Sequence, residues 1–190
     1  MEIVDYDPGW PRAFRDAAGP LRAALGDRAT RIDHIGSTSV PGLAAKDVID
    51  IQVSVSSDRE LDTAADVLEG AGWIVLRAID GDHPVPGWAP DDNAAGKVFL
   101  RERPGFRRTN IHVRAIGRPN QRYPLLVRDY LRTHPESAQA YGTLKRDLAA
   151  LVPGDPGRYA DVKDAVCDLI YFAAEDWARA TAWTAGPPGA

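Results

Sequence analysis

The sequence predicts an α/β (α+β) protein: a mixed sheet of about five strands, flanked by helices and followed by a C-terminal helical segment. Short apolar runs rich in β-branched residues alternate with segments whose apolar residues recur at helical spacing. After the last such run only helical patterns follow. The expected strands are 31–35, 48–55, 73–79, 97–101 and 109–115, and the expected helices are 10–25, 59–71, 124–133, 135–151 and about 155–183.

The first helix opens at Trp10-Pro11, because proline is tolerated at the first helical position. Its apolar face includes Phe14, Leu21 and Leu25. Pro20 interrupts this face and lacks the N–H group that a helix interior needs. We therefore expect a kink at Pro20 or a division into two short helices.

The loop at 80–95, DGDHPVPGWAPDDNAA, is long for a connection inside a compact domain. Its length indicates a lid, a binding loop or a mobile segment. Asp80, Asp82 and His83 are residue types that bind metal ions, but acidic loops are usually solvated, and we favour that second interpretation.

The strand at 109–115 has a polar face. Alternation places Asn110, His112 and Arg114 on one side and Ile111 and Val113 on the other. Amide, imidazole and guanidinium groups together on one face are more typical of a functional site than of a core.

Composition narrows the class of protein. The chain has 190 residues, 44% hydrophobic and 26% charged, and we expect one domain at 1–183 with a flexible Gly/Pro/Ala tail at 184–190. No apolar run approaches the roughly 18 residues of a membrane span, and the acidic N-terminus does not resemble a signal peptide. A single cysteine, Cys167, excludes an internal disulfide. These features favour a cytoplasmic protein and give no indication of its oligomeric state.

The net charge of −4 is unevenly distributed. The segment 97–132 holds ten basic residues and two acidic ones, nine of the ten being arginine. Arginine suits bidentate binding of phosphate or carboxylate. The alternatives are a solvated surface, or ion-pair partners for the acidic loop that precedes the segment. Nucleic acid is not favoured as a partner, because the chain is acidic overall and has no recognised nucleic-acid-binding motif.

The stretch 31–55 contains a candidate phosphate loop. Gly36, Ser37, Thr38 and Ser39 offer small side chains and backbone N–H groups between two expected strands, and His34 precedes them. Asp50 lies within the apolar second strand, where a carboxylate needs a partner such as a metal ion. The alternatives are an ordinary turn, a hydrogen-bonded Asp50 and a structural His34.

The residues HIGSTSVPGLAAKDVIDIQV resemble the signature of the GrpB family, within the nucleotidyltransferase (polymerase-beta-like) superfamily, and the resemblance extends over about 3–172. It implies a nucleotidyltransferase-like fold in which a Gly-Ser turn precedes a strand with an acid-x-acid pair. Asp50 matches the first acid of the pair, whereas Gln52 stands at the second. The resemblance also implies that His112 lies near Asp50, that Mg²⁺ is the metal ion, and that a nucleoside triphosphate is a substrate.

Two pairs at helical i, i+4 spacing, Tyr141/Lys145 and Tyr159/Lys163, are similar to Tyr-x-x-x-Lys pairs of the same family. If their helices cover the sheet, both lysines reach the pocket and bind phosphate. The alternative is that the lysines extend along a tyrosine stripe into solvent.

Three functional hypotheses follow. The first is metal-dependent transfer of a nucleotidyl or phosphoryl group to a small acceptor, the second is acid–base chemistry by His34 and His112 on a phosphate- or carboxylate-bearing metabolite, and the third is ligand binding without catalysis. The expected catalytic residues are Asp50 and His112, and the expected metal ligands are Asp50 and Gln52. The expected phosphate- or substrate-binding residues are Gly36, Ser37, Thr38, Ser39, His34, Lys46, Asn110, Arg114, Lys145 and Lys163.

Overall fold

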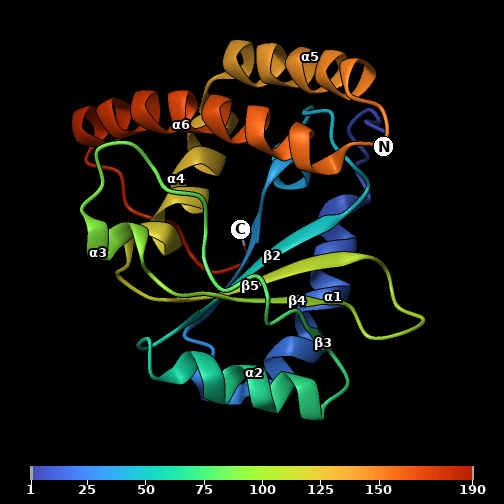
Figure 1. Cartoon of the computed structure of the whole chain (residues 1–190), viewed down its shortest axis with the longest axis vertical. Helices are drawn as coiled ribbons and strands as arrows, with labels where there is room; N and C mark the ends of the chain where they lie inside the picture. The colour runs from blue at the N-terminus through green and yellow to red at the C-terminus, as the bar shows by residue number, and fades with distance from the viewer. Residues whose placement is uncertain (1, 190) are drawn as a thin grey trace.

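The computed structural model describes residues 2–189, and its centre is a five-stranded mixed sheet with the order β1-β2-β5-β4-β3 (Figure 1). The parallel pair β2 and β5 lies in the middle, and the other neighbours are antiparallel. The predicted α/β class and strand number are confirmed. The strands are β1 Arg31–Ile35, β2 Ile49–Val55, β3 Ile74–Val75, β4 Val98–Arg101 and β5 Thr109–Ala115.

Helices cover both faces of this sheet (Figure 1). Helices α1 and α2 lie on one side, and α4, α5 and α6 form a layer on the other. The α-helices are α1 Trp10–Leu25, α2 Glu60–Gly70, α3 Pro90–Asn93, α4 Pro119–Thr133, α5 Pro135–Leu151 and α6 Pro156–Thr181.

The face of the sheet toward α1 and α2 is apolar. On β2 the fully buried residues Ile49, Ile51 and Val53 alternate with polar ones, and Ile111 and Val113 do the same on β5. They pack with apolar side chains of α1 and α2 in the largest core cluster. Burying about a dozen such side chains, at roughly 1.5–3 kcal/mol each, is the main force that fixes these helices to the sheet.

The opposite face is polar, and this asymmetry positions the candidate site. The register pairs Asp50 with Asn110 and Gln52 with His112. Because side chains two residues apart on a strand point to the same face, these four side chains lie together on the polar face. Every polar group buried there needs a partner from the helical layer above it or from a neighbouring strand.

Two sequence expectations about helices are wrong. The division of the first helix into two short helices is wrong, because Pro20 lies within the single helix α1, whose buried side chains Leu21 and Leu25 hold the last turns against the core. Helix α4 begins at Pro119 instead of Pro124, because Pro119 occupies the first helical position, where a missing N–H breaks no bond.

The expected strand at 73–79 is also mostly absent. Only Ile74 and Val75 pair with β4, and after one more bond, from Leu76 N–H to the Phe99 carbonyl, the chain turns away. The loop at 80–95 contains the short helix α3.

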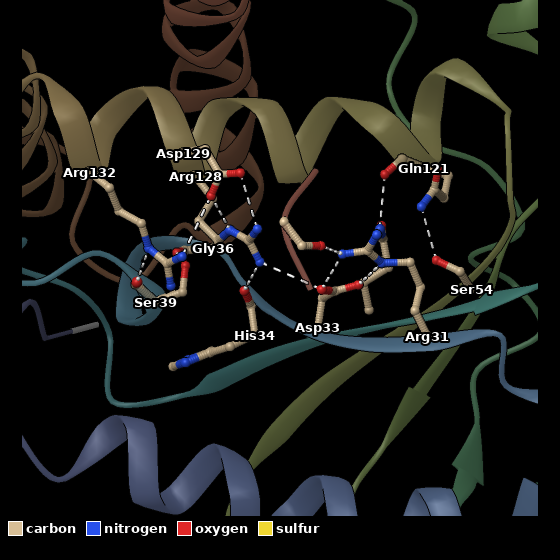
Figure 2. Close-up of polar contacts among 12 residues, drawn as sticks. Arg31, Asp33, His34, Gly36, Ser39, Ser54, Gln121, Arg128, Asp129 and Arg132 are labelled. Carbon is tan, nitrogen blue, oxygen red and sulfur yellow. Dashed lines mark hydrogen bonds and ion pairs between the residues drawn. The ribbon is translucent and has the colours of Figure 1, made fainter. Parts of the chain in front are cut away.

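Helix α4 is fixed to the polar face by charged and amide side chains (Figure 2). Arg128 donates to the carbonyl of His34 at 3.1 Å and lies 3.7 Å from the Asp33 carboxylate. Arg132 donates to the carbonyl of Ser39 at 3.0 Å. These bonds hold both ends of the turn that joins β1 to β2.

That turn, the 3-10 segment η2 at Ser37–Ser39, begins with a close approach between Gly36 and Asp50. Gly36 has φ +67°, and a Cβ placed on it would lie 2.4 Å from Asp50 Oδ2. Glycine is required there both by the backbone conformation and by the space.

The 80–95 loop is anchored through Asp82. Its carboxylate accepts bonds of 2.9 and 2.8 Å from Nε and Nη2 of Arg114, and one of 2.7 Å from Lys97 Nζ. Burial acts to raise the pKa of Asp82, but these two cations outweigh it, so the pKa lies far below the usual value.

The C-terminal segment contacts the sheet through Gly186, whose carbonyl accepts a 3.0 Å bond from Arg31. Ala190, part of the predicted tail, lies outside the described residues. The division into 1–183 and 184–190 stays a prediction. Among residues 2–189 we find no helix of the length and hydrophobicity needed to cross a membrane.

Asp82→Asn is expected to destabilise the protein by about 3 kcal/mol at neutral pH, because it leaves Arg114 buried without its carboxylate. Since the folded pKa of Asp82 is depressed, its stabilisation is present above the unfolded pKa near 3.8 and is lost as pH falls below that value. Urea unfolding at several pH values measures both effects. The exposed Asp91 in the same loop is the control, and Asp91→Asn should change little. Equal losses in the two variants would contradict the anchoring role.

Gly36→Ala is expected to cost about 2–4 kcal/mol of folding free energy, from the unfavourable φ and the contact with Asp50. Gly42→Ala provides the comparison, since Gly42 has φ +79° but nothing within 4 Å of the added Cβ. It should lose only about 1–2 kcal/mol. Denaturant midpoints measure the difference, and similar midpoints for both variants would refute the steric constraint.

Candidate functional site

The candidate site is the part of the polar face around Asp50, at the start of β2. Asp50 Oδ1 accepts a 2.7 Å hydrogen bond from Asn110 on the neighbouring strand. Burial raises the pKa of Asp50, and Asn110, Lys163, Lys145 and Lys46 act in the opposite direction. One carboxylate therefore lies among three ammonium groups, and the local charge is positive.

Lysine is concentrated in this region. The chain has four lysines against nineteen arginines. Three of the lysines act to lower the pKa of Asp50, and the fourth, Lys97, acts to lower the pKa of the nearby His112. Lys97 is paired with Asp82, so three of the four lysines remain beside Asp50, where their compact charges suit a small anion.

Lys145 of α5 reaches the Gly-Ser turn. Its Nζ donates to Ser37 Oγ at 2.7 Å and to the Ala44 carbonyl, and it lies 4.5 Å from the centroid of the Tyr141 ring. Only 2% of Lys145 is exposed, and burial lowers its pKa to about 7. The predicted Tyr141/Lys145 pair is thus present.

Lys46 and Lys163 approach from the η2–β2 connection and from α6. Lys46 Nζ lies 4.1 Å from the centroid of the Tyr159 ring, and Lys163, the predicted partner of Tyr159, acts to lower the pKa of the same tyrosine. Lys163 donates to Asp164 at 2.8 Å. Burial acts to lower the pKa of Lys163, but Cys167 and Asp164 outweigh it, and the pKa lies above the usual value.

His112 lies next to Asn110 on the same face of β5 and is partly exposed. Its Nδ1 is 3.3 Å from Arg114 Nη2, and its ring packs 5.0 Å from that of Phe99. Burial, then Arg114 and Lys97, hold the pKa of His112 well below its usual value. Because Arg114 can only donate, Nδ1 accepts and the proton lies on Nε2, which makes His112 a hydrogen-bond donor and a weak base.

The Gly-Ser turn contributes less than its sequence suggests. Ser37 points toward Lys145, but Ser39 Oγ donates to the Gly36 carbonyl at 2.6 Å. Thr38 is buried with its hydroxyl 3.0 Å from His34 Nε2. Thr38 and Ser39 therefore shape the turn.

His34 lies on the apolar face and not on the polar face around Asp50. It pairs with Ile51 across the sheet, and its ring stacks on Phe14 of α1 with centroids 4.8 Å apart. Burial, with Arg132 and Arg128 nearby, lowers the pKa of His34 to about 3. His34 and His112 are thus on opposite faces of the sheet and cannot act on one substrate.

The predicted metal pair, Asp50 and Gln52, does not fit a divalent cation. Gln52 is fully buried, its Oε1 accepts a 2.8 Å bond from Arg114, and its Nε2 donates to the Gln121 carbonyl at 2.9 Å. The oxygen that Mg²⁺ would need already binds a guanidinium group. Within residues 2–189 no cluster of three or more His, Cys, Asp or Glu side chains is arranged for a metal ion, which also excludes the Asp80, Asp82 and His83 set.

The predicted role of Arg114 as a phosphate ligand competes with its contacts in the structure, because four of its five N–H groups serve Asp82, Gln52 and His112. The Arg-rich segment mostly forms ion pairs, as one of our alternatives stated: Arg118 pairs with Asp58, and Arg122 with Glu175.

Sequence reasoning missed Arg101. It lies opposite Asn110 on β4 and hence on the same face of the sheet. Its Nε is buried and has no hydrogen-bond partner among the described residues. No local pattern marked Arg101, because its place beside Asn110 depends on the pairing of β4 with β5.

The part of the polar face around Asp50, which we call the cleft from here on, is accessible to solvent at several side chains: Ser37, Lys46, Asp50, Asn110, His112 and Lys163 are all partly exposed. It presents cations for an anionic group, one carboxylate that can accept a proton, and one imidazole donor. This set suits the binding of a phosphate ester next to a nucleophilic hydroxyl group.

Known proteins resemble this chain in sequence. A dephospho-CoA kinase of Mycobacterium tuberculosis is 38% identical over 95% of this chain and 47% of its own length. A UPF0157 protein of Pseudomonas aeruginosa is 34% identical over 90% of this chain and 66% of its own. The chain spans about half the length of the dephospho-CoA kinases it matches.

Solved structures resemble it in fold. The conserved protein GrpB from Enterococcus faecalis superposes with a TM-score of 0.74 at 31% identity, over 93% of this chain and 99% of that one. Cid1 in complex with its short product ApU gives a TM-score of 0.50 at 16% identity, over 77% of this chain and 43% of that one, which supports the nucleotidyltransferase-like fold alone. The family model described as "GrpB protein" matches residues 1–172 of this chain. Together with these relatives, this match shows that the chain belongs to the GrpB family.

Proposed function

We propose that this protein is a transferase that binds the phosphate groups of a nucleoside triphosphate in the Asp50 cleft and transfers a nucleotidyl or phosphoryl group to a small acceptor. The observation that supports it best is the group of three lysines around the single carboxylate of Asp50, beside a Gly-Ser turn.

Each residue has a chemical task in this proposal. Lys46, Lys145 and Lys163 offset the negative charge of the phosphates, including the charge that develops on the leaving group. Asp50 accepts the proton of the acceptor hydroxyl as the new P–O bond forms, and its raised pKa suits that role. His112 donates from Nε2 to a phosphate oxygen.

The acceptor proposed is a small molecule and not a nucleic acid. The relatives named dephospho-CoA kinase are by name kinases of a small molecule, and the chain matches about half of each. A divalent ion, where the reaction uses one, reaches the cleft with the nucleotide as part of the substrate, since Asp50 is the one carboxylate positioned for it.

The alternative of acid–base chemistry by two histidines is not supported, because His34 lies on the opposite face of the sheet. The alternative of ligand binding without catalysis uses the same lysines. A measurement of turnover distinguishes it from the proposal, because only a transferase consumes the nucleotide. Asp50→Asn should abolish consumption of the nucleotide and leave the far-UV circular dichroism spectrum unchanged. Unchanged turnover would exclude the proposed role of Asp50.

A thermal-shift screen of nucleotides and phosphorylated metabolites tests the binding. A ligand at about 100 times its Kd should stabilise the folded protein by about 2.7 kcal/mol and raise the melting temperature. Lys163→Met should remove most of that rise. Arg179→Met is the matched control, because it removes one positive charge from an exposed ion pair of the same helix. A rise that survives Lys163→Met and falls with Arg179→Met would place the site elsewhere.

Anion affinity should also depend on pH through Lys145. Below its pKa of about 7 the ammonium attracts an anion, and above that value the neutral amine does not. Sulfate is the suitable probe because its charge is constant in this range. Its affinity should fall about tenfold between about pH 6 and pH 8 in the wild type, as measured by calorimetry. The affinity of Lys145→Met should be lower and independent of pH, and the same pH dependence in that variant would assign the effect to another group.

A further inference from the structure

The donor groups around Asp50 are arranged for an anion and not for a metal ion. In a protein site Mg²⁺ takes oxygen ligands in near-octahedral geometry, usually including one or two carboxylates whose oxygens are free to coordinate it. Here Asp50 supplies one carboxylate, and one of its oxygens is already bonded to Asn110. Three ammonium groups lie close enough to influence it.

The position that would complete a carboxylate pair holds Gln52, and the structure provides a cation there instead. Arg114 Nη1 lies 2.8 Å from Gln52 Oε1 and is fixed by Asp82 on its other side. Arg114 is 5% exposed, so it is a permanent part of the sheet face. A second divalent ion would have to displace a paired guanidinium group.

Arg101 offers a contact that the protein itself leaves unused. It lies across from Asn110, its guanidinium is 5.6 Å from the Phe99 ring, and its Nε is buried without a partner in the part of the chain that is described. A buried donor without an acceptor costs about 1–3 kcal/mol, and an anionic ligand would remove that cost.

We infer that this cleft binds phosphate-bearing ligands without a protein-held divalent ion, with Lys46, Lys145 and Lys163 supplying the positive charge and Arg101 donating to the ligand. This inference rests on the proposed function, because it concerns the same cleft. It defines the ligand class as phosphate esters, diphosphates and triphosphates whose binding needs no metal ion held by the protein.

Replacement of Asp50 distinguishes binding through a metal ion from direct binding by the lysines, because it changes the ligand affinity in opposite directions in the two cases. If a metal ion bridges Asp50 and the ligand, Asp50→Asn loses the ion and the affinity falls. If the lysines bind the ligand directly, Asp50→Asn removes a repelling negative charge and keeps the oxygen that Asn110 contacts, so the affinity rises.

The experiment is calorimetric titration with inorganic pyrophosphate, in EDTA and in excess Mg²⁺. We expect the same Kd within about threefold in the two buffers, a Kd about tenfold lower for Asp50→Asn, and a Kd about tenfold higher for Arg101→Met. Arg103→Met is the control, since the Arg103 guanidinium stacks on Trp73 and Phe106 and should not affect binding.

The outcomes distinguish the inference from the proposed function. Binding only in Mg²⁺, or weaker binding by Asp50→Asn, overturns the inference and leaves the proposed function standing. Binding in neither buffer, by wild type or variants, overturns both. Binding in EDTA with no effect of Arg101→Met removes Arg101 from the ligand contacts. Circular dichroism and urea midpoints establish that each variant is folded.

Discussion

The approach of the Gly36 backbone to the Asp50 carboxylate is the constraint on which the rest of the site depends. There is no room for a Cβ between them, so the turn after β1 and the start of β2 have one relative position. That position places Ser37 within 2.7 Å of Lys145 on α5. Arg128 and Arg132 then bind the carbonyls of His34 and Ser39, which fixes α4 over the same turn. The contact between Gly36 and Asp50 thus fixes the turn, and hydrogen bonds to that turn fix α4 and α5 relative to β1 and β2.

A polar sheet face can be buried only if its groups satisfy one another, and most of this face does so. Arg114 is neutralised by Asp82, while Gln52 is bonded on both sides of its amide. Ser54 accepts from Gln121 at 3.0 Å. Around Asp50 donors exceed acceptors, because Lys46, Lys145 and Lys163 all act on Asp50, only Lys163 has a second carboxylate, Asp164, and the nearby Arg101 Nε has no partner among the described residues. The excess of donors at one end of an otherwise satisfied face is the physical reason for placing ligand binding there.

Much of the fold was predictable, because strand alternation and the Gly-Ser turn are local patterns. The strands at 31–35 and 109–115 match the structure, and Asp50 and His112 do lie on one face. The functions of Arg114 and His34 were not predictable. Arg114 is bonded to Asp82, 32 residues earlier in the chain, and a local pattern does not reveal such a partner. His34 lies on the apolar face of the sheet, opposite Ile51, because successive side chains of a strand point to opposite faces. Arg101 lacked any local signal of importance, since its significance lies in a partner it does not have.

Arginine and lysine have different uses in this protein, and the difference determines the charge of the site. Arginine keeps its charge when buried and binds carboxylates through two nitrogens, and the chain uses it for fixed pairs such as Arg114 with Asp82. Lysine has a compact charge whose pKa responds to its surroundings, and burial brings the pKa of Lys145 to about 7. If the proposed anion binds beside Asp50, it would raise the pKa of Lys145 and favour its protonated form, so that binding would take up a proton near neutral pH. An arginine in the same place would stay charged and could not couple binding to protonation in this way.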